Sequence, residues 1–332
     1  MKKLIFTLFV AFMATVALRA QQIAVVNTNG ATKLFRTFPD AINGADPGSV
    51  IYLPGGGFTI SNDLKITKKL TIIGIGHYVK SENPNVDGNT TIGGNLFFNE
   101  GSDGSAVMGC YITGNVNIGH DGKGISDVLI RFCNLNALHV GNKNCMETIV
   151  NQNYIRECSN FGASNAVVTN NVMHSIYDLD DGKIANNVIL HRTGLLPNGG
   201  GYPSNPSPFK ACERDQIMNN IFREANVRWE CDASNALSGN LAIQTDVVEY
   251  NLGEVDWNDV FENYNNATVS PESSFHFKGD YKQYETKCGI YGGTSFKDEQ
   301  MAPVPYITFK DVPQETDAQG KLNVRIRVSA NK

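Results

Sequence analysis

The sequence predicts an all-β solenoid, a coiled chain whose short strands stack on the equivalent strands of the next coil. Three observations predict it: a repeat of about twenty residues, strand-like alternation inside each repeat, and an asparagine at one recurring position. The recurring position falls on Cys110, Cys133, Asn153, Asn171, Asn187, Asn220 and Asn240. The steps between these residues are 23, 20, 18, 16, 33 and 20 residues, which is the spacing of a solenoid.

Each repeat contains short alternating apolar runs that are broken by Asn, Gly, Asp and Ser, a pattern typical of strands. No repeat has the unbroken helical periodicity that a helical solenoid needs. Stacked strands lie about 4.8 Å apart, so amide side chains at one position can hydrogen-bond along the stack as a ladder. The recurring asparagine is therefore predicted to be structural.

Residues 1–20 resemble a secretory signal peptide, because two lysines precede a short apolar run. The run is too short to predict a membrane span, and we expect an exported protein. Removal of this segment leaves 25 basic and 33 acidic residues, a net charge of about −8. Such an acidic chain is not expected to bind nucleic acid, although local basic positions can hold an anionic sugar.

The seven cysteines show no CxxC pair and no zinc-ligand spacing. Cys110 and Cys133 occupy the ladder position, where a thiol packs as a small apolar side chain. We expect mostly free, buried thiols.

The chain before the repeats predicts an entrance module. Residues 23–26 form a possible first strand, and residues 35–45 a short amphipathic helix with Phe38, Ala41 and Ile42 on one side. Strands are expected within residues 49–53, 54–60 and 70–76. Because a solenoid must hide the core of its first coil, the helix is expected to act as a cap.

Residues 38–42, 47–60 and 69–76 resemble the opening of right-handed parallel β-helix proteins of the pectate-lyase-like superfamily. Residues 288–293 are similar to the glycine-rich close at the far end of such helices. The resemblance covers residues 35–295 and implies a single-stranded right-handed parallel β-helix. It says little about activity, because this architecture occurs in lyases, hydrolases, esterases and binding proteins.

Three segments are therefore expected: the signal peptide at 1–20, the β-helix with its N-terminal cap at 21–295, and a C-terminal tail at 296–332. Residues 322–328 of the tail alternate strictly and predict a half-buried strand. The tail is too short for a core of its own, so it is expected to pack on the β-helix.

Outward-facing side chains of one sheet are the candidates for sugar binding. Alternation predicts a stripe of Asn117, His139, Tyr177, Arg228 and Glu230 on one face. The 33-residue step contains an insertion, residues 194–215, whose Tyr202 and Lys210 would wall a groove beside the stripe. Plain solvation of an exposed sheet and a decorative insertion are the competing interpretations.

An acidic turn follows Tyr177. Asp178, Asp180 and Asp181 could bind calcium through their oxygens, and Asp178 could also contact substrate. Clustered carboxylates can also serve acid–base hydrolysis, and a polar turn rich in Asp is the simplest interpretation.

The sequence therefore predicts an exported, monomeric β-helix that binds a polysaccharide or cell-surface glycan, with calcium as a possible cofactor. The alternative is a polysaccharide lyase that acts by β-elimination on uronic-acid glycans, with Arg228 and Lys210 as its basic groups, or a glycoside hydrolase. No catalytic motif decides between these classes.

Overall fold

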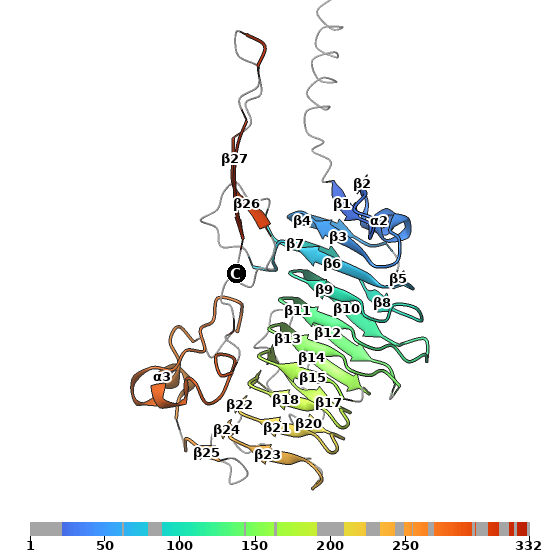
Figure 1. Cartoon of the computed structure of the whole chain (residues 1–332). Helices are drawn as coiled ribbons and strands as arrows, with labels where there is room; N and C mark the ends of the chain where they lie inside the picture. Colours follow the sequence, from blue (N-terminus) through green and yellow to red (C-terminus); the bar gives the residue numbers. More distant parts are fainter. Residues whose placement is uncertain are drawn as a thin grey trace, which may run out of the picture.

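The computed structural model shows a parallel β-solenoid of about eight turns with few helices (Figure 1). Its described residues are 22–61, 63–78, 88–142, 144–162, 165–190, 209–223, 233–242, 249–253, 255–264, 269–293, 296, 305–311, 319–321 and 324–330. The predicted signal peptide lies outside these residues. In the part described, no helix is long and apolar enough to cross a membrane.

One side of the coil is an eleven-stranded sheet. In spatial order its strands are β2 (Thr32–Phe35), β1 (Ile23–Val26), β3 (Ser49–Leu53), β6 (Leu70–Gly74), β9 (Ala106–Met108), β11 (Leu129–Arg131), β13 (Ile149–Asn151), β15 (Val167–Thr169), β18 (Lys183–Ala185), β21 (Gln216–Met218) and β23 (Ala236–Ser238). Strand β1 pairs antiparallel with both β2 and β3, and every later pair is parallel.

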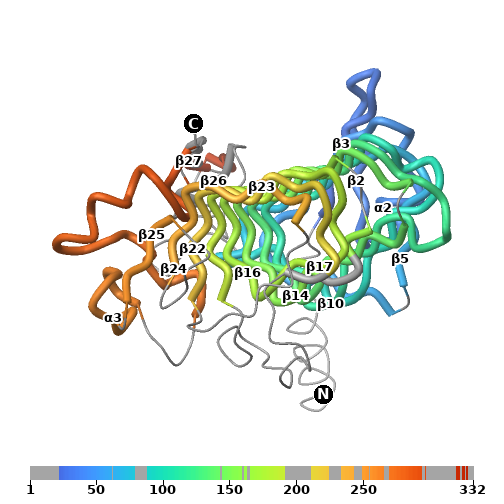
Figure 2. Tube along the Cα trace, turned by 90° about the horizontal axis from the view of Figure 1, so that it is seen from below, coloured from blue at the N-terminus to red at the C-terminus, as the bar shows by residue number. Residues whose placement is uncertain are grey.

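A fourteen-stranded sheet closes the other sides of the coil and has two limbs. The first limb contains β4 (Gly56–Thr59), β7 (Thr90–Gly93), β10 (Tyr111–Ile118), β12 (Asn134–Val140), β14 (Tyr154–Phe161), β16 (Val172–Met173), β19 (Val188–Ile189), β22 (Ile221–Phe222), β24 (Leu241–Ala242) and β25 (Tyr250–Asn251). The second limb contains β5 (Leu64–Ile66), β8 (Leu96–Phe98), the later halves of β10, β12 and β14, then β17 (Ile176–Tyr177) and β20 (Phe209–Lys210). The view along the coil in Figure 2 shows the equivalent strands stacked behind one another.

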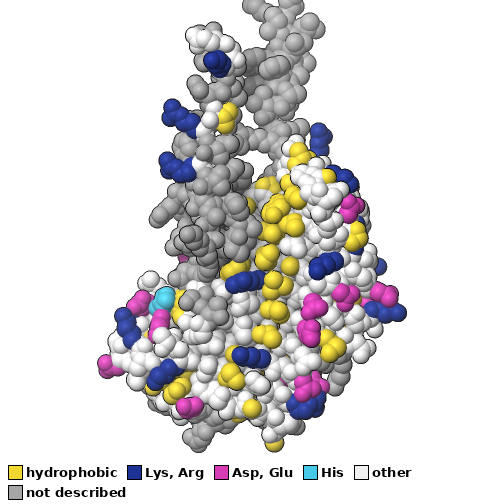
Figure 3. All heavy atoms as spheres, in the orientation of Figure 1, with side chains coloured by type: hydrophobic (Ala, Val, Ile, Leu, Met, Phe, Trp, Pro, Cys, Tyr) yellow, Lys and Arg dark blue, Asp and Glu magenta, His cyan; other side chains and the backbone are white. Residues whose placement is uncertain are grey.

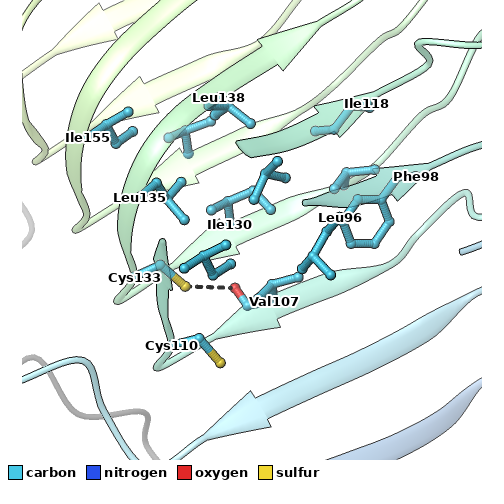
Figure 4. Close-up of a cluster of buried hydrophobic side chains, with 14 of the residues drawn as sticks. Leu96, Phe98, Val107, Cys110, Ile118, Ile130, Cys133, Leu135, Leu138 and Ile155 are labelled. Carbon is cyan, nitrogen blue, oxygen red and sulfur yellow. Dashed lines mark hydrogen bonds between the residues drawn. The ribbon is translucent and has the colours of Figure 1, made fainter. Parts of the chain in front are cut away.

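The core fills the interior of the coil. Inward side chains repeat from coil to coil, so that Val107, Ile130 and Val150 lie on paired strands and are fully buried. Figure 4 shows Ile130 among Leu96, Leu135 and Leu138, with the Cys133 thiol donating to the carbonyl of Val107 at 3.6 Å. The six described cysteines are all free and buried, as predicted, and Cys231 lies outside the described residues.

The asparagine ladder is confirmed. Asn171 Nδ2 donates to Asn187 Oδ1 at 3.0 Å, and Asn187 Nδ2 donates to Asn220 Oδ1 at 2.9 Å. The same contact joins Asn153 to Asn171 and Asn220 to Asn240. The amide oxygens of Asn171, Asn187, Asn220 and Asn240 also accept from the main-chain N–H of the preceding ladder asparagine. The Nδ2 atoms also donate to main-chain carbonyls of the preceding coil.

The residue before each ladder position makes the turn. Asn170, Asn186 and Asn219 have φ of 55°, 56° and 57°, the left-handed region that Asn tolerates better than most residues. In an Asn-Asn pair the first residue therefore turns the chain and the second enters the ladder. Val188 pairs directly with Ile221, so the 33-residue step is a single coil with an insertion.

The entrance module contains helix α2 (Phe38–Gly44), which begins where Thr37 Oγ1 accepts from the N–H of Asp40. Phe38, Ala41 and Ile42 are buried and join the core, as the pattern predicted. Strand β2 was not predicted, because residues 32–35 face solvent on both sides and lack a buried alternation.

Residues 255–264 and 269–293 form a layer on the outer side of the first limb. It contains α3 (Trp257–Val260) and the 3₁₀ turn η1 (Gly279–Tyr284), and its apolar residues pack on outward side chains such as Val172, Val188 and Ile221. Asn170 Nδ2 donates to the carbonyls of Ile290 and Gly292. The glycine-rich segment 288–293 thus lies along the flank of the coils, and its expected place at the far end was wrong.

The tail contains β26 (Pro305–Asp311) and β27 (Arg325–Ala330), which form an antiparallel two-stranded sheet. Among the described strands they pair only with each other. Packing of the tail on the β-helix stays a prediction.

Candidate functional site

The predicted stripe lies on the second limb of the fourteen-stranded sheet. Asn117 of β10 pairs in register with His139 of β12, and Tyr177 of β17 pairs with Lys210 of β20. Strand β14 lies between the two pairs. Its Cys158 pairs with Leu138, which precedes His139, and with Ile176, which precedes Tyr177. The structure therefore brings these four predicted residues into one column.

The members of this column differ in accessibility. Asn117 is only 6% exposed, so it is poorly placed to meet a ligand, and its Nδ2 lies 3.4 Å from the carbonyl of Leu96. His139 and Tyr177 are half-buried. Phe97 precedes Asn117 in the column, and its ring meets that of His120 edge-on, with ring centres 5.7 Å apart. The side chains of the column are therefore aromatic more often than charged.

The remaining predicted sugar contacts lie outside the described residues. These are Tyr202, Arg228, Glu230 and the side chain of Lys210. Most of the insertion, residues 194–208, lies outside them as well.

The acidic turn pairs with a cation. Arg214 donates through Nε to Asp181 Oδ1 at 3.0 Å and through Nη2 to Asp180 Oδ1. Asp178 takes a left-handed conformation, with φ of 65°. In the part of the chain that the structure describes, no three His, Cys, Asp or Glu side chains converge on a point that could hold a metal ion. The calcium role of Asp178, Asp180 and Asp181 finds no support in this arrangement.

Asp215 is a buried carboxyl beside that turn. It is 1% exposed, its Oδ1 accepts from the N–H of Gly182 at 2.6 Å, and its Oδ2 has no hydrogen-bond partner among the described residues. Burial raises its pKa to about 6, and the carboxylates of Asp180 and Asp181 add to the shift. The sequence analysis did not single out Asp215.

A second ladder runs on the outside, at the bend between the two limbs; we call it the bend ladder. Asn95 Nδ2 donates to Asp63 Oδ1 at 3.0 Å, and Asn95 Oδ1 accepts from the N–H of Asn115 at 2.8 Å. Asn136 Nδ2 then donates to Asn115 Oδ1 at 2.8 Å, and Arg156 Nε donates to Asn136 Oδ1 at 2.8 Å. The bend ladder therefore has a carboxylate at one end and a guanidinium at the other.

The guanidinium end of the bend ladder borders a groove. It is lined by Tyr111, Ile112, Thr113, Asn134, Leu135, Asn136, Tyr154, Ile155, Arg156 and Pro271. No described residue accepts a hydrogen bond from the terminal nitrogens of Arg156, which is half-buried. A cation with free donors thus lies beside tyrosine rings and amides.

The far wall of the groove comes from the outer layer. Pro271 is followed by Glu272, whose Oε1 accepts from the Tyr78 hydroxyl at 2.6 Å. Burial and the bond to Glu272 raise the pKa of Tyr78 to about 12, because both favour the protonated phenol. This contact ties the layer to the chain that follows β6.

The sequence contained a signal for the bend ladder that the analysis missed. Asn95, Asn115, Asn136 and Arg156 follow one another at steps of 20, 21 and 20 residues, the length of a coil. The groove itself had no such signal, because Pro271 comes from a segment outside the repeats.

Comparison of the chain with protein-family models, curated proteins and solved structures found no match. The fold and the groove define a parallel β-solenoid with a polar groove on its flank.

Proposed function

We propose that this protein binds an acidic polysaccharide along the outer side of the fourteen-stranded sheet. The observation that carries the proposal is Arg156, which is oriented by Asn136 at the groove and donates to no described residue through its terminal nitrogens. A guanidinium can bind a carboxylate through two parallel hydrogen bonds. The amides of Asn134 and Asn136 suit sugar hydroxyls, and the rings of Tyr111 and Tyr154 supply an amphipathic wall.

The coil also suits a ligand longer than one sugar. Equivalent residues recur about every 4.8 Å, so a chain lying along the axis meets a similar side chain at each coil. From the groove such a chain can cross the bend toward His139 and Tyr177, which lie on β12 and β17, on either side of β14. The negative net charge of the protein makes the recognition local, because long-range attraction of a polyanion is unfavourable.

The test is affinity electrophoresis of the protein on a panel of uronic-acid and neutral polysaccharides. We expect retardation by at least one acidic polymer, and a loss of affinity of about tenfold in Arg156→Ala, because a hydrogen-bonded charge pair is removed. Lys183→Ala is the matched control, since Lys183 is an exposed cation on the eleven-stranded sheet. Equal retardation of the Arg156→Ala variant and the unchanged protein would contradict the proposal.

A polysaccharide lyase is the second candidate, because a free guanidinium in a groove can neutralise the uronate carboxylate beside which a proton is abstracted. Incubation of the same polymers, with and without calcium, distinguishes the two. Growth of ultraviolet absorbance from unsaturated ends would make the protein a lyase. Release of reducing ends without that absorbance would make it a hydrolase.

We further propose that the coil is right-handed, that α2 caps its first turn, and that the chain belongs to the pectate-lyase-like superfamily. The burial of Phe38, Ala41 and Ile42 against the first strands supports the cap. Export is proposed from residues 1–20 alone. Mass spectrometry of the secreted protein tests it, with a new N-terminus near residue 21 as the expected result.

A further inference from the structure

The outer face of the eleven-stranded sheet carries an apolar stripe. Leu129, Ile149 and Val167 pair in register on β11, β13 and β15, and Met108 of β9 lies beside this column, paired with Arg131 at the end of β11. Ile149 is 43% exposed and the other three are half-buried. Figure 3 shows apolar side chains running down this face of the molecule. A continuous exposed apolar surface on a soluble domain usually marks a contact site.

Arg131 interrupts the stripe at the end of β11. Its guanidinium lies 4.5 Å from the centre of the Phe132 ring, and its Nε is buried without a hydrogen-bond partner among the described residues. No described carboxylate forms an ion pair with it. Partial burial lowers its pKa, because desolvation disfavours the charged form. An acceptor from outside the chain would remove this deficit.

Exposed acids follow the opposite edge of the stripe. Asp127 precedes β11 and Glu147 precedes β13, both in the left-handed conformation with φ of 59° and 57°. Both are exposed, and neither forms an ion pair with any described residue. In Figure 3 acidic side chains gather along one side of the apolar stripe. The stripe therefore has a cation on one edge and carboxylates on the other, none of them in an ion pair with a described residue.

We propose that this stripe is the contact surface between two copies of the chain, related by a twofold axis that runs along the stripe. Such an axis exchanges the two edges at the same level of the coil. It therefore places Arg131 of each copy against Asp127 and Glu147 of the other. Leu129 and Ile149 each pack against the same residue of the other copy. A twofold contact needs a surface that is complementary to itself, and this arrangement of charges around an apolar centre meets that need.

The contact is independent of the proposed glycan groove. The stripe belongs to the eleven-stranded sheet and the groove to the fourteen-stranded sheet, so both grooves stay open in the pair. The sequence predicted a monomer, because a column of exposed residues on separate repeats is not visible as one surface until the coils are stacked.

The test is sedimentation equilibrium of the full protein over about 1 to 100 µM, the range in which weak pairs dissociate. We expect a dimer that Ile149→Lys, Arg131→Glu and Asp127→Arg each weaken by about thirtyfold or more. The double variant Arg131→Glu/Asp127→Arg restores the opposite charges at positions 131 and 127 and should recover part of the affinity, because Glu147 keeps its charge. Leu34→Lys is the matched control, because Leu34 is 60% exposed on β2, away from the pair of charged edges.

Circular dichroism of every variant checks that the coil is intact, and the double charge reversal keeps the test valid should Ile149→Lys fail to fold. A monomer at about 100 µM would overturn the proposal. So would a dimer that is indifferent to Arg131→Glu and Asp127→Arg, or a double variant that stays monomeric. A monomer that begins to self-associate only when residues 297–332 are deleted would show that the chain's own tail covers the stripe.

Discussion

Two ladders of side chains run along this coil at the same spacing, one inside and one outside. In the inner ladder, Asn171 and Asn187 are fully buried, and both the oxygen and the nitrogen of each amide are bonded. In the bend ladder, Asn136 is half-buried and accepts from Arg156 Nε, and the terminal nitrogens of Arg156 bond to no described residue. The coil repeat produces both ladders, and burial determines whether their polar groups are available to a ligand.

The difference has a physical reason. A buried amide group without a hydrogen-bond partner destabilises the folded state, so the amides of the inner ladder need all their bonds within the protein. They are therefore not available to bind a ligand. A surface ladder can leave donors unpaired at low cost, because water binds them until a ligand displaces it. The largest expected effects therefore lie in the inner ladder and the smallest on the outside.

Asn187→Leu should give the largest loss of stability. It removes the acceptor of Asn171 and the donor to the Val168 carbonyl, and we expect about 4 kcal/mol of destabilisation from buried groups left unpaired. Chemical denaturation at neutral pH measures it. A loss below about 1 kcal/mol would show that the inner ladder is not structural.

Asp215→Asn should stabilise the protein at neutral pH. The raised pKa means that the folded state holds the proton up to about pH 6, whereas the unfolded carboxyl releases it near 3.8. The contribution of Asp215 is therefore fully present below pH 3.8 and is lost as the pH rises to about 6. At about 1.4 kcal/mol per pKa unit this amounts to at most about 3 kcal/mol.

The measurement is a series of unfolding curves between pH 4 and 7 for both proteins. The variant should lack the decline of stability with rising pH that Asp215 causes, because an amide does not titrate. Identical pH profiles for Asp215→Asn and the unchanged protein would contradict the assignment.

Asn136→Leu should show directly that the two ladders have different roles. Since Asn136 is half-buried and water can replace its partners, we expect less than about 1 kcal/mol of destabilisation. Binding of acidic polysaccharide should still weaken several-fold, because Arg156 loses the bond that orients it. A stability loss as large as that of Asn187→Leu would mean that both ladders serve the fold.

Tyr177→Ala should have the smallest effect on stability, because its ring is partly exposed. Retardation by a long acidic polymer should weaken, while retardation by short fragments should not change, because only a long chain reaches from the groove to β17. Equal weakening for both lengths would place Tyr177 at the groove itself.

The fold could be predicted in large part. The spacing of Asn153, Asn171 and Asn187 fixed the repeat, and the alternation around them fixed the strands, because both properties belong to short stretches of chain. Strand β2 and the outer layer of residues 255–264 and 269–293 could not be predicted this way. Their positions depend on contacts with distant coils, such as that of Gly289 with Asn219.

The site could be predicted only in part. Alternation placed Asn117, His139 and Tyr177 on one face, and the strand register brings them into one column, where Lys210 of the predicted insertion pairs with Tyr177. It could not show that Asn117 is buried or that Arg214 occupies the acidic turn, since both depend on neighbouring coils.

The sequence by itself determined the coil, because each repeat carries its own strands, its own turn residue and its own ladder amide. Only the tertiary structure decided where the surfaces lie. Stacking brought Arg156 beside Tyr111 and Pro271, and it aligned Ile149 with Leu129 next to Arg131, whose Nε has no hydrogen-bond partner among the described residues. The reason is that a repeat specifies which way a side chain points, whereas its neighbours in space, tens of residues away, specify whether it is covered, paired or free.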